Sequence, residues 1–329
     1  MDTKKPLIIL TGPTAVGKTH LSIALAKAVN GSVISADSMQ VYKYMDIGSA
    51  KIRPEEMEGV PHYLVDVLDP SEEFHVVRFQ QMAREALSEI YSQGKIPILT
   101  GGTGFYIQAL LRDIDFTENG EDTQYREELE ALAKERGGQY LHNLLRECDS
   151  KAADEIHPNN VKRVIRALEY FHQTGAPISA HNEEQKQKGS PYNFAYFVLN
   201  DDRGKLYARI EQRIDEMLAE GLVDEVKALK ERGYTRDMVS MQGLGYKEFL
   251  DYLSGKTTYE EAVYLLKRDT RHFAKRQLTW FKREQDVIWL NKPDFAYDEE
   301  KILGKMLEIC TQKGMLSRQS EKEYREDEE

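Results

Sequence analysis

Long apolar segments and cysteines are both scarce in this sequence of 329 residues. No apolar run approaches the roughly 20 residues that a membrane-spanning helix requires. The apolar stretch near the N-terminus, residues 7–10, is too short for a signal peptide. The two cysteines, Cys148 and Cys310, are too few for a disulfide framework or a four-cysteine zinc site. These absences predict a soluble, cytoplasmic protein with no membrane partner and no structural zinc.

A surplus of positive charge is also lacking, because 45 Lys and Arg against 56 Asp and Glu give a net charge of −11. This balance argues at first against a polyanionic partner. The charges are segregated, however. Residues 313–329 form an acidic tail that we expect to be disordered, whereas residues 262–283 carry seven bases and one acid. The net charge therefore does not exclude a nucleic acid.

Short apolar runs alternate with helical stretches over the first hundred residues. The predicted strands are residues 7–10, 32–36, 63–67 and 96–100, and the predicted helices between them are residues 18–29 and 75–93. Alternation of this kind is typical of a parallel sheet with right-handed crossovers.

The pattern changes after about residue 115, where strand signals stop and only short polar helices are expected. Strand patterns return at residues 194–200 and 287–290. We therefore predict an α/β fold of about two domains. A P-loop NTPase-like parallel sheet core comprises residues 1–115 and 191–312, and a mostly helical insertion domain comprises residues 116–190.

A phosphate-binding motif follows the first predicted strand and precedes the first predicted helix. It reads GPTAVGKT, a complete G-x4-G-K-T. Glycines let backbone amides converge on phosphate oxygens, and the helix N-terminus adds a positive dipole end. The motif predicts that a diphosphate or triphosphate binds to Gly12, Pro13, Thr14, Ala15, Val16, Gly17, Lys18 and Thr19. Lys18 supplies a mobile cation, and the Thr19 hydroxyl suits a magnesium ligand.

Two further polar groups follow other predicted strands, and parallel strands end at one edge of the sheet. Asp37 follows residues 32–36, and its role could be that of a magnesium ligand, a base toward a hydroxyl or amine, or a structural cap. Thr103 lies in the glycine-rich stretch GGTGFY, residues 101–106, which could also be a simple strand-to-helix turn. These features alone are equally typical of a small-molecule kinase.

A longer set of motifs resembles the tRNA dimethylallyltransferase family, also called tRNA isopentenyltransferases, of bacterial type. The set comprises GPTAVGKT, SADSMQVYKYMDIGSAK (35–51), GGTGFY, HPNNVKRVIRALE (157–169) and RQLTWFK (276–282), in order across residues 7–290. The stretch MQGLGYKE (241–248) matches in its glycines and varies at its flanks.

The resemblance implies transfer of a dimethylallyl group from dimethylallyl diphosphate to the exocyclic amine of adenosine 37 of tRNA, with release of diphosphate. It implies that the P-loop binds the diphosphate of the prenyl donor, with magnesium, rather than ATP. Asp37 suits the role of general base, because the adenine amine is a weak nucleophile. The catalytic residues implied are Asp37, Lys18 and Thr103. Arg209 and Arg213, one helical turn apart, can reach the diphosphate or can pair with nearby acids.

The resemblance also implies a partner, the anticodon stem-loop of tRNA, with no obligate protein partner and a monomer as the default. The residues expected to contact tRNA are Asp37, Ser38, Met39, Gln40, Thr103, Arg126, Asn160, Val161, Lys162, Arg163, Val164, Gln242, Gly243, Lys275, Arg276, Gln277 and Trp280. A basic helix opening at Thr258 is expected to place Lys267, Arg271 and Lys275 on one RNA-facing row. An ordinary solvated basic face, with Trp280 in the core, is the alternative.

Three alternatives remain open from the sequence alone. An adenylate isopentenyltransferase would perform the same chemistry on a free nucleotide and would need no extended RNA surface. A P-loop kinase would give residues 116–190 and 262–283 no function. A non-enzymatic RNA-binding protein would not need Lys18, Thr19 and Asp37 together.

Overall fold

The computed structural model describes residues 4–116 and 123–316, and within them a six-stranded sheet has the order β3-β2-β4-β1-β5-β6. The strands are β1 (Pro6–Thr11), β2 (Gly31–Ser35), β3 (His62–Tyr63), β4 (Ile96–Gly101), β5 (Asn193–Asn200) and β6 (Val287–Asn291). Each neighbouring pair is parallel. The predicted parallel sheet is confirmed, and β1, which precedes the P-loop, is at its buried centre.

The strand predicted at residues 63–67 is wrong beyond Tyr63. Leu64 and Asp66 have positive φ angles of 62° and 58°, which take the backbone out of the extended conformation. The amides that follow bond to an irregular loop instead, with Asp66 N donating to Gln40 O at 2.9 Å and Val67 N to Val41 O at 2.8 Å. The short apolar run therefore reflects packing against this loop rather than a strand.

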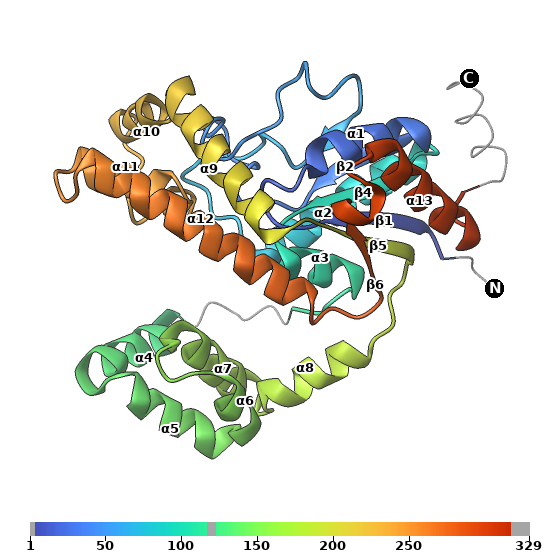
Figure 1. Ribbon diagram of the computed structural model, residues 1–329. Coiled ribbons are helices and arrows are strands. Elements are labelled where there is room, and N and C mark those ends of the chain that lie inside the picture. Colours follow the sequence, from blue (N-terminus) through green and yellow to red (C-terminus); the bar gives the residue numbers. More distant parts are fainter. Residues whose placement is uncertain (1–3, 117–122, 317–329) are drawn as a thin grey trace, which may run out of the picture. The chain divides into compact units, whose positions relative to one another are not determined.

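Helices cover both faces of the sheet (Figure 1). Helices α1 (Lys18–Ala28) and α13 (Glu299–Gln312) pack together on one face, and α2 (Val76–Ser92) and α3 (Gly104–Leu111) pack together on the other. The remaining helices of this unit are α9 (Arg203–Glu220), α10 (Leu222–Glu231), η1 (Ser240–Gln242), α11 (Tyr246–Leu253), α12 (Tyr259–Phe281) and η2 (Lys292–Phe295). The Thr258 hydroxyl accepts a hydrogen bond from Glu261 N at 3.1 Å, so α12 begins where its sequence predicts.

Residues Arg112–Ser190 form a second compact unit. Its helices are α4 (Thr123–Arg136), α5 (Gly138–Cys148), α6 (Ser150–Glu155), α7 (Val161–Thr174) and α8 (Ile178–Gln187). They enclose an apolar core of their own, which includes Leu141, Leu145 and Leu168. The Asp149 carboxylate caps α6 through Ala152 N at 2.9 Å and also accepts from Ser179 N at 2.9 Å, which ties α6 to α8.

The acidic tail predicted at residues 313–329 lies outside the described residues from 317 onward. Among the helices that the structure describes, none is long and apolar enough to cross a membrane.

Candidate active site

The three loops singled out in the sequence follow three adjacent strands of the sheet. The strands β2, β4 and β1 are neighbours, and their carboxyl ends lead into Asp37, Thr103 and the P-loop respectively. Hydrogen bonds draw the loops together, because Thr103 N donates to Ala36 O at 3.2 Å and the Thr11 hydroxyl donates to Gly101 O at 2.6 Å. The sheet topology thus assembles one site from residues that lie far apart in the sequence.

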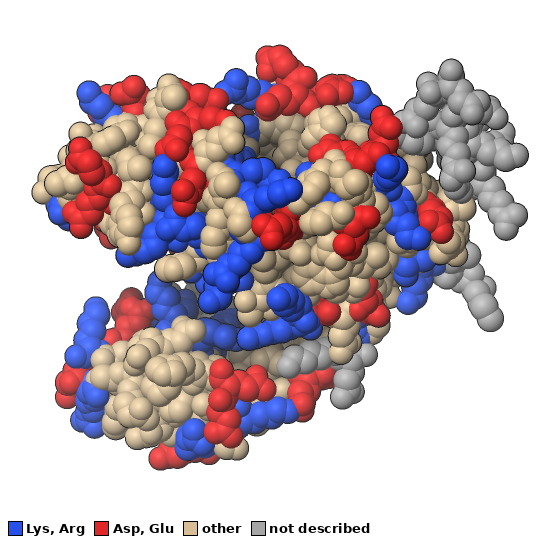
Figure 2. Space-filling view, viewed as in Figure 1, with Lys and Arg blue, Asp and Glu red and all other residues tan. Residues whose placement is uncertain are grey.

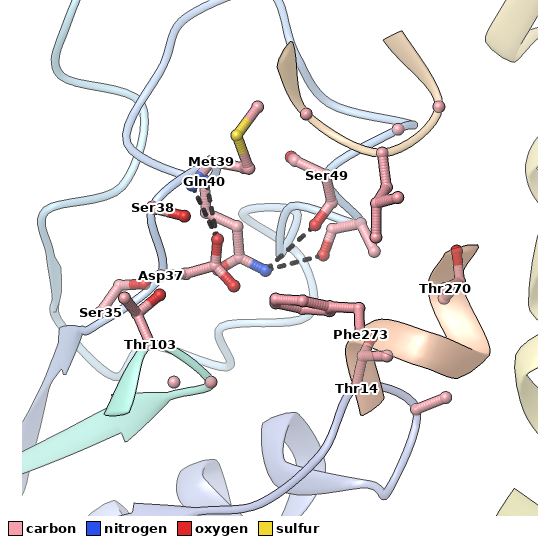
Figure 3. A pocket seen from close by; sticks show the side chains of 18 of the residues that line it. Thr14, Ser35, Asp37, Ser38, Met39, Gln40, Ser49, Thr103, Thr270 and Phe273 are labelled. Atoms are coloured by element: carbon pink, nitrogen blue, oxygen red, sulfur yellow. Dashed lines mark hydrogen bonds between the residues drawn. The ribbon is translucent and has the colours of Figure 1, made fainter. Parts of the chain in front are cut away.

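A cavity of about 530 Å³ opens above these loops. Asp37, Ser38 and Thr103 lie on one side of it, and Thr270 and Phe273 of α12 lie on the other (Figure 3). The predicted site residues that line it are Thr14, Ala15, Gly17, Lys18, Thr19, Asp37, Ser38, Met39, Gln40, Thr103, Arg213, Gln242, Gly243, Arg276 and Gln277. Gly12, Pro13, Val16, Arg209, Lys275 and Trp280 do not line it.

The P-loop is pressed against the neighbouring strand β5. Gly12 has a φ of 148°, and a Cβ at this position would lie 2.3 Å from the Leu199 carbonyl oxygen, so only glycine fits. The Lys18 ammonium folds back over the loop and donates to Gly12 O at 3.0 Å and Pro13 O at 2.8 Å. Burial lowers the pKa of Lys18 to about 8, against an opposing effect of the Asp37 carboxylate.

The two arginines of α9 have different environments. Arg209 Nε donates to Ala15 O at 3.0 Å, and its Nη2 donates at 2.5 Å to Asp201, a carboxylate whose side chain is fully buried. Arg213 lines the cavity, where burial lowers its pKa and the Asp37 carboxylate raises it. The geometry therefore favours Arg213 for contact with a diphosphate, and it makes Arg209 a support for the P-loop backbone.

The Asp37 carboxylate is held by its own loop. Its Oδ1 accepts hydrogen bonds from Met39 N at 2.8 Å and Gln40 N at 3.3 Å (Figure 3). These bonds resemble a cap, but the residues that follow form turns rather than a helix. The Gln40 amide in turn donates to Ala50 O at 3.0 Å, which closes the loop on itself. Asp37 is thus oriented before any substrate arrives.

A carboxylate that the sequence reasoning missed holds the far end of this loop. Glu225 of α10 accepts from the successive amides of Asp46, Ile47 and Gly48 at 2.9, 2.8 and 3.1 Å, and from the Tyr246 hydroxyl at 2.8 Å. A Cβ on Gly48 would lie 2.7 Å from the Tyr246 ring, so the glycine permits this close approach. The stretch MDIGSAK marks this part of the loop in the sequence, but it does not indicate that Glu225 binds its amides.

Two predicted tRNA-contact residues on α12, the buried Gln277 and the half-buried Trp280, pack on the loops of the site. The buried Gln277 amide accepts from Thr14 N at 2.9 Å and donates to Gly102 O at 3.0 Å. The Trp280 ring lies on Gly104, where a Cβ would come within 2.2 Å of it. The structure therefore places the Gln277 and Trp280 side chains against the core loops, as in the alternative left open for Trp280.

The expected row of RNA-facing cations on α12 also needs correction. Lys267 pairs with Asp215 and Arg271 pairs with Glu211, each at 2.5 Å, so these two cations join α12 to α9. Lys275 and Arg276 are exposed. Figure 2 shows Lys and Arg side chains gathered along the C-terminal half of α12. The i, i+4 spacing was correct, but a neighbouring helix covers the first two members.

In the helical unit, some residues predicted to contact tRNA are exposed and others are buried. Arg126, Asn160, Lys162 and Arg163 are exposed, and Arg126 pairs with Glu169 at 3.3 Å. Val161 is half-buried, and Val164 is fully buried at 0% exposure. The Val164 side chain is therefore closed to RNA, and it serves the core of the unit.

Clusters of three or more His, Cys, Asp or Glu residues that could hold a metal ion are absent from residues 4–116 and 123–316. A magnesium ion held mostly by phosphate oxygens and water needs no such cluster. Thr19, exposed in the first turn of α1 and lining the cavity, offers a hydroxyl oxygen suited to it.

A parallel sheet with the G-x4-G-K-T loop, a carboxylate and a threonine around one cavity places the chain in the class of P-loop-like α/β proteins. The chain belongs to the IPP transferase family, whose sequence profile matches residues 40–284. It is 66% identical over 312 residues to the tRNA dimethylallyltransferase of Lachnoclostridium phytofermentans, covering 95% of this chain and 99% of that one.

Two solved structures are similar to it over most of its length. The tRNA isopentenylpyrophosphate transferase of Bacillus halodurans has 47% identity and a TM-score of 0.71, covering 94% of this chain and 98% of that one. A eukaryotic dimethylallyltransferase described as acting on tRNA has 33% identity and a TM-score of 0.76, covering 87% and 74%.

Proposed function

We propose that this chain transfers a dimethylallyl group from dimethylallyl diphosphate to the exocyclic amine of adenosine 37, next to the tRNA anticodon. The family and its relatives make the chain a prenyltransferase that modifies tRNA. The donor, the position of the adenosine and the roles of individual residues are inferred from the site. We also propose that the enzyme acts in the cytoplasm, as a monomer.

The cavity suits a donor that is charged at one end and apolar at the other. The P-loop, Lys18 and Arg213 offer amides and cations to a diphosphate, which leaves with a heavy negative charge. Ile210, Ile214 and Leu266 line the same cavity and supply apolar surface for a prenyl chain. This division favours an allylic diphosphate over a free phosphate.

Asp37 acts on the acceptor, the exocyclic amine of the adenosine. The bond from the prenyl C1 to the diphosphate oxygen breaks, the bond from the adenine amine nitrogen to C1 forms, and the amine proton passes to the Asp37 carboxylate. The bonds from Met39 N and Gln40 N fix that carboxylate at the cavity wall. Thr103 lines the same cavity and offers a hydroxyl to the leaving diphosphate oxygen or to the adenine ring.

Magnesium, when bound with the diphosphate, would supply further positive charge to the leaving group. Thr19 would hold it from the protein side, together with phosphate oxygens and water. Lys18 and Arg213 would neutralise the oxygens that the metal leaves exposed.

The tRNA would reach the site with its adenosine unstacked from the anticodon loop, a change that costs a few kcal/mol. Phosphate contacts can offset this cost. Exposed cations on each unit suit such contacts. They are Lys275 and Arg276 in the first unit and Arg126, Lys162 and Arg163 in the second.

The observation that carries the proposal is the opening of the P-loop, Asp37 and Thr103 into one cavity. The test is transfer of radiolabel from dimethylallyl diphosphate with magnesium to unmodified tRNA, AMP and ATP in parallel. Label in tRNA alone, at adenosine 37, supports the proposal. Label in AMP or ATP would make the chain a free-nucleotide prenyltransferase, and no label in any acceptor would return the P-loop to the kinase alternative.

A further inference from the structure

The inward face of α12 contacts two loops of the site, the P-loop and the loop that carries Thr103. Gln277 is 6% exposed, and both polar ends of its side chain are used. Its Oε1 accepts from Thr14 N in the P-loop at 2.9 Å, and its Nε2 donates to Gly102 O in the loop before Thr103 at 3.0 Å. One amide therefore bridges the donor loop and the loop beside the general base.

The fit around this bridge is close enough to restrict both partners. A Cβ on Gly102 would lie 2.1 Å from Gln277 Nε2, and one on Gly104 would lie 2.2 Å from Trp280 Cδ1. Gln277 and Trp280 are three residues apart and so share a helix face. The stretches GGTGFY and RQLTWFK are therefore two halves of one contact.

A merely apolar core residue would not serve at position 277. It would leave the Thr14 amide and the Gly102 carbonyl without their partner, at a cost of about 1–3 kcal/mol for each buried polar group. A direct contact with RNA is equally unsuited to Gln277, because its side chain is buried and both of its polar atoms are already bonded.

We propose that Gln277 is a positioning residue that fixes the distance between the diphosphate and the acceptor amine. The inference rests on the proposed function, in which the P-loop holds the donor and Asp37 and Thr103 receive the adenosine. Thr103 N bonds to Ala36 O, so a shift of the Gly102 turn also moves the backbone that carries Asp37. Misplacement of reacting groups by about 1 Å can cost 10²-fold in rate without loss of binding.

The test is a Gln277→Glu variant, which keeps the volume and the acceptor for Thr14 N and removes the donor to Gly102 O. We expect the single-turnover rate at saturating tRNA and donor to fall about tenfold or more, with the KM for tRNA within about threefold of wild type. The new carboxylate beside the P-loop should by itself raise the KM for the donor, which saturation with donor removes from the measured rate. Thr279→Ala, on the exposed face of the same helix, is the matched control and should leave both parameters unchanged.

A second variant reaches the same bridge from the other side. Gly102→Ala places a methyl group where Gln277 Nε2 lies, so it should lower the turnover in the same way. The double variant should then cost little more than either single one, because both break one bridge. Equilibrium dialysis of labelled donor without tRNA should show nearly unchanged binding in Gly102→Ala, which adds no charge.

The outcomes separate this inference from the proposed function. A wild-type protein that transfers no label to tRNA contradicts the proposed function. A wild type that transfers label, with a Gln277→Glu variant of unchanged turnover, contradicts the positioning role alone. A raised tRNA KM at unchanged turnover would instead assign Gln277 to RNA contact. If Gln277→Glu does not fold, the turnover of Gly102→Ala tests the positioning role. Additive losses of turnover in the double variant would contradict a single shared bridge.

Discussion

The two walls of the cavity are built in different ways. The donor wall is the P-loop, a short motif between β1 and α1 whose shape is set by glycines and by Lys18 bonding to its own carbonyls. The acceptor wall is the irregular segment 37–51, and it is held by side chains that accept backbone amides. Asp37 holds the near end of that segment, and Glu225 of α10 holds the far end.

The two walls also differ in how far along the sequence their supporting residues lie. The motif of the donor wall lies within eight consecutive residues, and Arg209 and Gln277 each support it at a single backbone group. Three successive amides of the acceptor wall depend on one remote carboxylate, 178 positions from Ile47. In the proposed function the donor wall acts through positive charge, and the acceptor wall acts through the placement of one general base. Substitutions in the two walls should therefore alter different kinetic parameters.

The largest effect is expected for Asp37→Asn. Asn keeps an oxygen that can accept from Met39 N, so the loop should hold its shape, but Asn cannot take the amine proton. We expect turnover to fall by about 10²–10⁴-fold, the usual contribution of a general base, with tRNA and donor still bound. Single-turnover rates and binding measured separately for each substrate would check this.

Asp224→Asn is the matched control for that variant, because Asp224 is an exposed carboxylate of α10 that does not line the cavity. It should change turnover little. Near-normal turnover of Asp37→Asn would remove Asp37 from the role of base. Loss of tRNA binding in that variant would make Asp37 a structural residue of the acceptor wall.

Much of the fold was predictable because its signals are local. Strand periodicity, the P-loop motif and the Thr258 cap each depend on neighbouring residues, and each prediction agrees with the structure. The strand at residues 63–67 failed where the chain bonds to a loop more than twenty residues earlier. A short apolar run indicates which side chains are buried, and it does not indicate what the backbone pairs with.

The site was predictable only in part, for the same reason. The motifs placed Lys18, Asp37 and Thr103 at one cavity, but nothing in them revealed Glu225 as a partner of the acceptor wall. Charge spacing on α12 could not show that α9 covers Lys267. Residue type suggested an RNA contact for Gln277, and only tertiary packing shows that it faces the P-loop.

A smaller effect, confined to the acceptor wall, is expected for Glu225→Gln. Gln turns an N–H group toward amides that now donate to a carboxylate, and the loss of hydrogen bonds to this charged acceptor costs about 1–3 kcal/mol. We expect the tRNA KM to rise about tenfold, since 1.4 kcal/mol is a factor of ten, with donor binding unchanged. Steady-state kinetics with each substrate varied in turn would measure both.

Tyr246→Phe provides a graded comparison for that variant. It removes one donor to Glu225 and leaves the three backbone amides in place, so its tRNA KM should lie between that of wild type and that of Glu225→Gln. An equal rise in the KM for the donor would contradict the separation of the two walls.

The smallest effect is a pH dependence in the donor wall. Burial lowers the pKa of Lys18 to about 8, so its charge is present below that pH and is lost as pH rises through it. A diphosphate needs that charge, and donor kcat/KM should therefore fall roughly fourfold between pH 7 and 8.5.

Stability should move in the opposite direction. The unfolded chain keeps Lys18 protonated up to its ordinary pKa of 10.5, so burial of the charged group costs stability below about pH 8, and this cost is relieved between pH 8 and 10.5. A Lys18→Arg variant, charged throughout this range, should bind the donor with a flat pH profile in the same interval. A flat wild-type profile, or the same slope in both proteins, would show that the donor wall does not depend on the titration of Lys18.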